Sequence, residues 1–246
     1  MGYLGYKPAD KPLTSADITD SIITSAKITD GTIANADINS SAAIALSKLS
    51  TTGTASASNY LRGDGAWSTV SSDYVLLATT DASSSASVSF NGYFSSTYKN
   101  YIVIFTNIIP SSNGNEAFKI RYRRSNADIT ASNYRGVGNW TSITTGGTQT
   151  NSTAGFNNTN SANLTTASTT TSGYGISGDV IIYDALSTTN YKIFIAQTFT
   201  SDPSQELVHH KPAGRLVDSQ DALSGLTFFF ASGNITSGNF KLYGIK

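Results

Sequence analysis

The chain contains no cysteine and few charged residues. None of its 246 residues is cysteine, which excludes disulfides, thiolate zinc sites and a thiol nucleophile. Charged residues make up 13% of the chain, against a usual figure of about 25%, and Ser, Thr, Asn and Gly take their place. Such a surface is more typical of an extracellular or particle-borne protein than of a cytosolic enzyme.

The charge that is present is balanced. Sixteen basic residues match sixteen acidic ones, so the chain has no large cationic field to attract phosphate backbones or anionic lipids. No apolar run approaches about 18 residues, and the N-terminus has no signal-peptide core. We therefore expect no nucleic-acid partner, no membrane insertion, and a chain that is soluble in the cytoplasm where it is made.

Near the N-terminus an apolar residue recurs at every fifth position, beginning with Leu13. A period of five fits neither a helix nor a strand and indicates a solenoid or a fibrous shaft. A unit this small cannot bury its isoleucine alone, so it needs a neighbour. We predict a pentad-repeat shaft over residues 13–50, in which the chains of a homotrimer bury these side chains about a shared axis. The predicted axial residues are Ile18, Ile23, Ile28, Ile33 and Ile38.

Two other interpretations of this segment are open. A disordered Ser/Thr linker would leave the isoleucine spacing as an accident. The content of Ile, Thr, Ser, Asp and Gly disfavours a helix, although residues 39–50 have the cap and the apolar side needed for a short one.

Residues 51–72 contain the stretch NYLRGDGAWST, whose Arg-Gly-Asp tripeptide suggests a cell-adhesion ligand. A three-residue match arises often by chance, and the flanking residues explain the stretch better. Gly63 and Gly65 allow a tight turn that Asp64 can close, while Leu61 and Trp67 can be buried at its base. We interpret the stretch as the junction between the shaft and a globular head, and the tripeptide as incidental.

Residues 73–246 have the pattern of a β domain. About eight runs rich in Tyr, Phe, Ile and Val alternate with Gly, Asn and Ser turns, without helical periodicity between them. They predict an all-β fold, an antiparallel β-sandwich of the jelly-roll kind. Residues 125–177 are poor in apolar side chains, and we expect long loops there with one or two edge strands.

One candidate receptor-binding cluster lies in the stretch SNYRGVGNWTS. Sugar recognition needs flat aromatic faces and hydrogen-bond donors on a rigid scaffold. Tyr134, Arg135, Asn139 and Trp140 supply both within seven positions. The alternative is that the two aromatic residues belong to the core or to a trimer interface.

A second candidate is the stretch FKIRYRR. Arg121 and Arg123 alternate with apolar residues, so one face of the expected strand is basic. That face suits phosphate or uronate groups of a bacterial surface polysaccharide. The alternative is a solvated outer face that discourages edge pairing.

The sequence offers little support for catalysis. Glycosidases need two carboxylates across a cleft, and the chain has only two glutamates, Glu116 and Glu206. His209 and His210 are neighbours, which on a strand point to opposite faces and cannot share a metal ion. We therefore predict no enzyme activity, no cofactor and no metal site.

The order of these motifs resembles that of tail fibres and related receptor-binding proteins of tailed bacteriophages, particularly those of marine and cyanobacterial hosts. The resemblance covers essentially the whole chain and rests on YLGYKPADKPLTSADI, the ITDGTI-type repeats, YLRGDGAWS and the ending SGNFKLYGIK. It implies a location on the virion, with residues 1–12 attached to other virion proteins, a trimeric shaft, and a head that binds a host surface polysaccharide or outer-membrane receptor. A structural fibre or decoration protein without receptor binding is the alternative, and a glycan-degrading tailspike is a third hypothesis.

Overall fold

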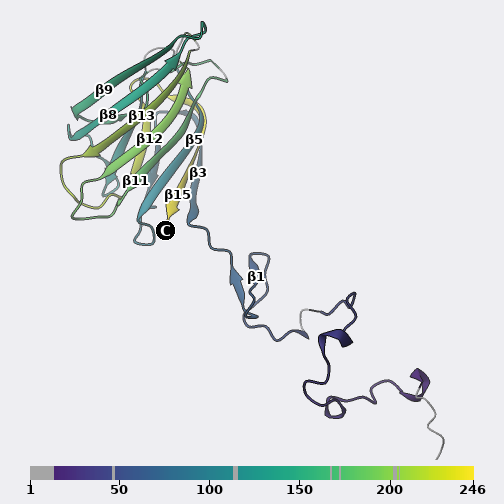
Figure 1. The fold of residues 1–246 in the computed structure, drawn as a ribbon. Helices are drawn as coiled ribbons and strands as arrows, with labels where there is room; N and C mark the ends of the chain where they lie inside the picture. The colour runs from purple at the N-terminus through teal and green to yellow at the C-terminus, as the bar shows by residue number, and fades with distance from the viewer. Residues whose placement is uncertain are drawn as a thin grey trace, which may run out of the picture. The chain divides into compact units, whose positions relative to one another are not determined.

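The computed structural model describes residues 14–45, 48–112, 116–166, 168–171, 173–201, 204 and 206–246. The chain divides into two units, with the boundary between Val70 and Ser71 (Figure 1). Throughout the described ranges the fold is all-β, and its helical content consists of single 3₁₀ turns. No helix in those ranges is long and apolar enough to cross a membrane.

The N-terminal unit begins with a repeating local structure. Three 3₁₀ turns, η1 (Ser15–Asp17), η2 (Ser25–Lys27) and η3 (Asn35–Asp37), follow one another at intervals of ten residues. Asp17 and Asp37 close their turns by accepting the backbone N–H three residues earlier, at 2.8 and 2.7 Å. A second kind of turn lies between the 3₁₀ turns. The structural unit is therefore ten residues long, twice the isoleucine period, because two kinds of turn alternate.

The isoleucines of the repeat have no cover within the single chain. Their exposed fractions lie between 38% and 55%, and every described residue from 14 to 45 is exposed. Leu13 lies outside the described residues. The described part of 39–50 contains no α-helix, since residues 40 and 41 form a turn. The segment thus presents a regular row of apolar side chains to its surroundings.

The junction stretch forms a β-hairpin. Strands β1 (Asn59–Leu61) and β2 (Trp67–Thr69) pair antiparallel, with Leu61 opposite Trp67. Trp67 is half-buried, whereas Leu61 is 38% exposed. The backbone N–H of Trp67 donates to the carbonyl of Thr52, which adds a third segment to the hairpin.

The Arg-Gly-Asp tripeptide forms the turn of this hairpin. Asp64 accepts the N–H of Ala66 at 3.1 Å, which closes the turn, and its carboxylate lies 3.1 Å from the Arg62 guanidinium. Gly65 has a φ of +80°, a conformation that favours glycine, while Gly63 has no positive φ. The two charged side chains of the tripeptide therefore contact each other, and the turn accounts for the sequence.

The C-terminal unit contains two antiparallel sheets. The large sheet has the order β3 (Tyr74–Ser85), β15 (Ile235–Ile245), β5 (Asn100–Pro110), β11 (Ile176–Tyr183), β12 (Ile193–Ser201), β13 (Leu207–Leu216), β8 (Tyr134–Ile143) and β9 (Gln149–Thr159). The small sheet has the order β10 (Ala162–Asn163), β6 (Phe118–Arg124), β14 (Gly225–Phe230) and β4 (Val88–Asn91), and β7 (Ala127–Asp128) pairs with β6. Figure 1 shows the large sheet as the broad layer of labelled strands.

Phenylalanine side chains from both sheets form the centre of the core. The Phe105 ring of β5 lies 5.3 Å from the Phe118 ring of β6 and 6.0 Å from the Phe228 ring of β14, measured between centroids. Each of the three is at most 1% exposed. The two sheets therefore pack face to face, as in a β-sandwich, and each strand alternates between core-facing and outward residues.

Residues 125–177 hold more strand than the composition indicates. Strands β8 and β9 form a long hairpin there, and β9 is the edge strand of the large sheet. This segment has few apolar residues, but β8 pairs with β13 over ten positions. Backbone hydrogen bonds to the existing sheet hold the hairpin, so the expected edge strand is present as β9, and much of the segment expected as long loops is strand.

Candidate functional site

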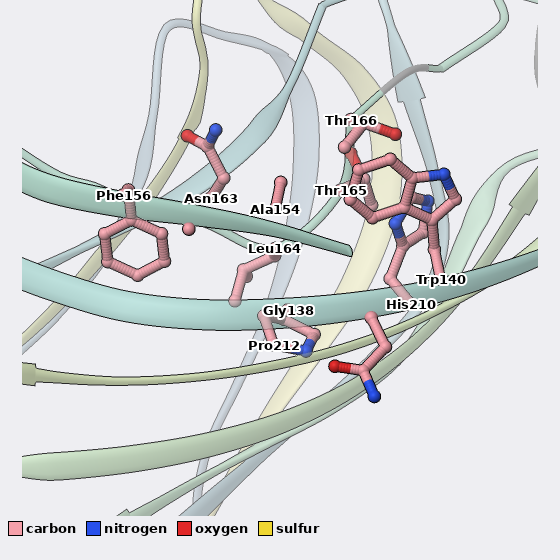
Figure 2. Close-up of a pocket in the computed structure, with 12 residues that line it drawn as sticks. Gly138, Trp140, Ala154, Phe156, Asn163, Leu164, Thr165, Thr166, His210 and Pro212 are labelled. Carbon is pink, nitrogen blue, oxygen red and sulfur yellow. The ribbon is translucent and has the colours of Figure 1, made fainter. Parts of the chain in front are cut away.

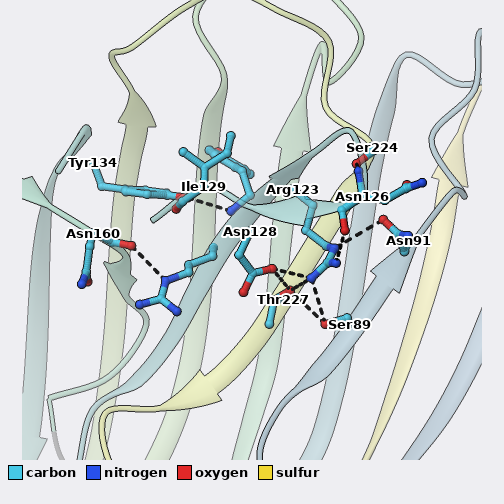
Figure 3. A network of polar contacts seen from close by, with 12 residues as sticks. Ser89, Asn91, Arg123, Asn126, Asp128, Ile129, Tyr134, Asn160, Ser224 and Thr227 are labelled. Atoms are coloured by element: carbon cyan, nitrogen blue, oxygen red, sulfur yellow. Dashed lines mark hydrogen bonds and ion pairs between the residues drawn. The ribbon is translucent and has the colours of Figure 1, made fainter. Parts of the chain in front are cut away.

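Tyr134 is a core residue. It is 1% exposed, and its hydroxyl donates to the Ile129 carbonyl at 3.0 Å and accepts the Tyr122 N–H at 2.9 Å (Figure 3). Burial raises the pKa of Tyr134 well above its ordinary value. The side chain has no surface to offer to a receptor, so its predicted role in binding is replaced by a structural one.

Arg123 is held by a polar network within the small sheet (Figure 3). Its guanidinium binds the Asp128 carboxylate and donates to Thr227 Oγ1 at 2.9 Å and to Asn91 Oδ1 at 3.3 Å. These partners lie on β7, β14 and β4, so Arg123 connects the strands around β6. Its hydrogen-bonding capacity is used inside the head, which argues against its predicted role as a receptor contact.

Arg121 lies beside it on the outward face of β6. Its Nε donates to the carbonyl of Asn160 at 3.0 Å, and its guanidinium lies 4.3 Å from the centroid of the Phe229 ring. The predicted basic face therefore exists, since Phe118, Ile120 and Tyr122 point to the core. The arginines of this face mainly contact neighbouring residues of the head.

The remaining predicted residues all lie on β8 but point to different faces of the large sheet. Arg135 and Asn139 point outward from the large sheet, whereas Trp140 points to the inner face, because successive strand residues alternate. Arg135 binds Asn158 Oδ1 at 3.2 Å and lies opposite Arg215 of β13. The cluster expected from SNYRGVGNWTS is therefore divided between the core and two faces of one strand.

Trp140 lines a half-enclosed cavity of about 50 Å³ on the inner face of the large sheet (Figure 2). The wall comes from β8, β9 and β13, from Asn163 of the short strand β10 and from residues 164–166, which follow it. Phe156, Leu164 and Pro212 make most of it apolar. A cavity of this volume has room for a small substituent but not for a whole sugar ring.

His210 is one of the polar residues of this cavity, together with Asn139, Asn163, Thr165 and Thr166. Figure 2 shows its ring next to Trp140, and the ring centroids are 6.1 Å apart. His210 is 3% exposed, and its Nε2 has no hydrogen-bond partner among the described residues. Burial, with a smaller contribution from His209, lowers the pKa of His210 to about 4. The imidazole is therefore neutral at pH 7, with one donor and one acceptor nitrogen.

His209 lies on the opposite face of β13 and stacks on Phe199, with centroids 4.2 Å apart. The expectation that the two histidines point to opposite faces is thus confirmed. Within the described ranges, no group of three His, Cys, Asp or Glu residues is placed to hold a metal ion.

Sequence reasoning identified Trp140 but missed His210 as its neighbour. The two residues are 70 positions apart and meet because Trp140 of β8 lies opposite His210 of β13. No local pattern signals this pairing. Comparisons of the chain with protein-family models, curated proteins and solved structures gave no match.

Proposed function

We propose that the chain is a virion fibre, attached to the particle through residues 1–12, that binds a host-surface glycan with its β head. The observation that carries this proposal is the joining of two unlike parts. A ten-residue repeat with exposed isoleucines precedes a compact β unit with its own core. Exposed apolar side chains at regular intervals need identical neighbours, which a homotrimeric shaft supplies.

The strand order supports a jelly-roll head. The chain alternates between the sheets, with β3 and β5 in the large one and β4 and β6 in the small one, and the first strand of the head pairs with the last. The β8–β9 and β12–β13 hairpins extend the large sheet beyond the usual four strands. Jelly rolls present loops and added hairpins on a rigid scaffold, which suits a binding head.

The cavity beside Trp140 is the favoured contact for the glycan. Trp140 offers a flat apolar face, and the neutral His210 offers a hydrogen-bonding nitrogen without a partner among the described residues. A small neutral sugar substituent, such as an acetamido or hydroxymethyl group, has the size and the polarity that the cavity accepts.

Competition for adsorption tests this function. The purified full chain is added to host cells before the phage, and we expect it to block adsorption. Trp140→Ala should lose this effect, whereas Thr141→Ala, a change at the neighbour on the opposite face of β8 and outside the cavity lining, should keep it. A wild-type chain that does not compete would favour a purely structural fibre, and release of reducing ends from host polysaccharide would favour a depolymerase.

A further inference from the structure

The outward face of the large sheet is unusually apolar. Among the described residues of the head, thirteen large hydrophobic side chains are exposed, and only three of these, Tyr93, Tyr174 and Tyr191, lie elsewhere. The other ten point outward from this sheet: Tyr74, Leu76, Ile104, Val137, Ile143, Tyr183, Ile193, Ile195, Phe199 and Leu207. The small sheet has no comparable set among its described residues.

These residues are aligned by the strand register. One row crosses seven neighbouring strands, with each member directly opposite the next, and every member is apolar. We call it the apolar belt: Leu76, Tyr243, Ile102, Ile181, Ile195, Ala213 and Val137. A row of this length is a continuous surface rather than a scatter of single exposed side chains.

The surface is large enough for a specific interface. The ten exposed side chains present on the order of 900 Å², and one partner of a standard protein–protein interface buries about 800 Å². A patch of this size on a soluble protein marks an interaction site. The face therefore needs a partner with an apolar surface of similar extent.

A second copy of the same chain meets this need. The inference rests on the proposed fibre, in which the repeat holds several copies in parallel. Tyr74, at one end of the face, is four residues from Val70, so the link spans at most roughly 14 Å. Copies joined through the repeat would meet at an effective concentration on the order of millimolar, which favours contact even if the heads attract each other weakly.

Charge on this face also fits a neighbouring copy. Arg135 and Arg215 lie directly opposite each other on β8 and β13, an arrangement that is unfavourable for two like charges. Asp179, on the same face of β11, has no hydrogen bond or ion pair within the described residues, and burial among apolar neighbours raises its pKa. An acid on one part of the face and two bases on another are complementary between copies.

We propose that the outward face of the large sheet, centred on the apolar belt, is covered by the heads of neighbouring copies of this chain. Cysteine reporters in the full chain test it, because the wild type has no thiol. Ile195→Cys reports on the belt, and Thr130→Cys, in an exposed segment after β7, is the control. We expect maleimide to label the belt thiol at least about tenfold more slowly than the control, and equally fast in urea.

A second substitution separates apolar contact from other causes of protection. Val137→Asp, at a belt position that is 65% exposed in the single chain, should raise the labelling rate of Ile195→Cys to that of the control. Asn139→Asp, two residues along the same face, should leave the thiol protected. Continued protection in the Val137→Asp chain would count against the proposal.

Sedimentation distinguishes failure of this inference from failure of the proposed fibre. Rapid labelling of Ile195→Cys in a chain that sediments as a trimer would overturn the belt contact and leave the shaft intact. A wild-type chain that sediments as a monomer would overturn both.

Discussion

Two stacked tyrosines in the head should respond in opposite ways to loss of the hydroxyl group. Tyr122 and Tyr134 are both about 1% exposed, and their ring centroids are 5.9 Å apart. The Tyr134 hydroxyl satisfies two backbone groups, the Tyr122 N–H and the Ile129 carbonyl. The Tyr122 hydroxyl is buried without a hydrogen-bond partner in the described part of the chain.

The expected magnitudes follow from these contacts. Tyr134→Phe leaves a buried donor and a buried acceptor unpaired, each of which costs about 1–3 kcal/mol, so we expect a loss of roughly 2–6 kcal/mol in the free energy of unfolding. Tyr122→Phe removes a hydroxyl that is already unpaired, so we expect no loss and a gain of up to about 1 kcal/mol. Both variants keep the aromatic ring and its packing.

Urea unfolding of the full chain, followed by circular dichroism, measures the difference. The midpoint of Tyr134→Phe should lie below that of the wild type, and the midpoint of Tyr122→Phe should equal or exceed it. The slope of the free energy of unfolding against urea concentration should stay unchanged. Equal destabilisation by the two substitutions would refute the assignment, because it would mean that the Tyr134 hydroxyl has no special role and that ring packing alone matters.

Three further perturbations follow from the structure. Gly225→Ala would place its Cβ 1.8 Å from the Phe90 carbonyl oxygen. We therefore expect either no soluble protein or a free energy of unfolding that is lower by about 3 kcal/mol or more. Gly63→Ala, with open space around it, should leave the free energy of unfolding unchanged in the same urea titration. Ile28→Asp should convert the proposed trimer to monomers in sedimentation while the urea midpoint of the head stays unchanged. The pKa of His210 is about 4 in the folded chain, below the unfolded value of about 6.5. Between these two pH values the folded state binds fewer protons than the unfolded state. The free energy of unfolding should therefore fall by up to about 3 kcal/mol as the pH falls from 6.5 to 4. His210→Gln should remove most of this slope in urea midpoints measured across that range.

Features that depend on neighbouring residues could be predicted from the sequence. The alternation in FKIRYRR placed Phe118 and Ile120 in the core, and the side-chain period of two is a property of any strand. The turn at Asp64 and Gly65 followed from the same local chemistry, since a carboxylate that accepts a nearby N–H and a residue free to adopt positive φ suffice for it.

Features that depend on distant segments could not. Tyr134 and Trp140 could not be told apart in the sequence, where each was either a receptor contact or a core or interface aromatic, yet one satisfies the backbone of β6 and the other lines a cavity with His210. The segment of β8 and β9 was expected to form long loops with one or two edge strands because its composition lacks apolar residues, and the length of its two strands depends on a sheet built from segments elsewhere in the chain.

The sequence by itself thus determined the all-β class, the order of repeat, junction and β unit, and the local turns, because short-range periodicity and turn chemistry set these. The tertiary structure decided which polar and aromatic residues are free to bind and which are used for stability. It also aligned the apolar belt, whose members come from seven strands. Strand register brings such residues together, and register depends on pairing between segments that no local pattern specifies.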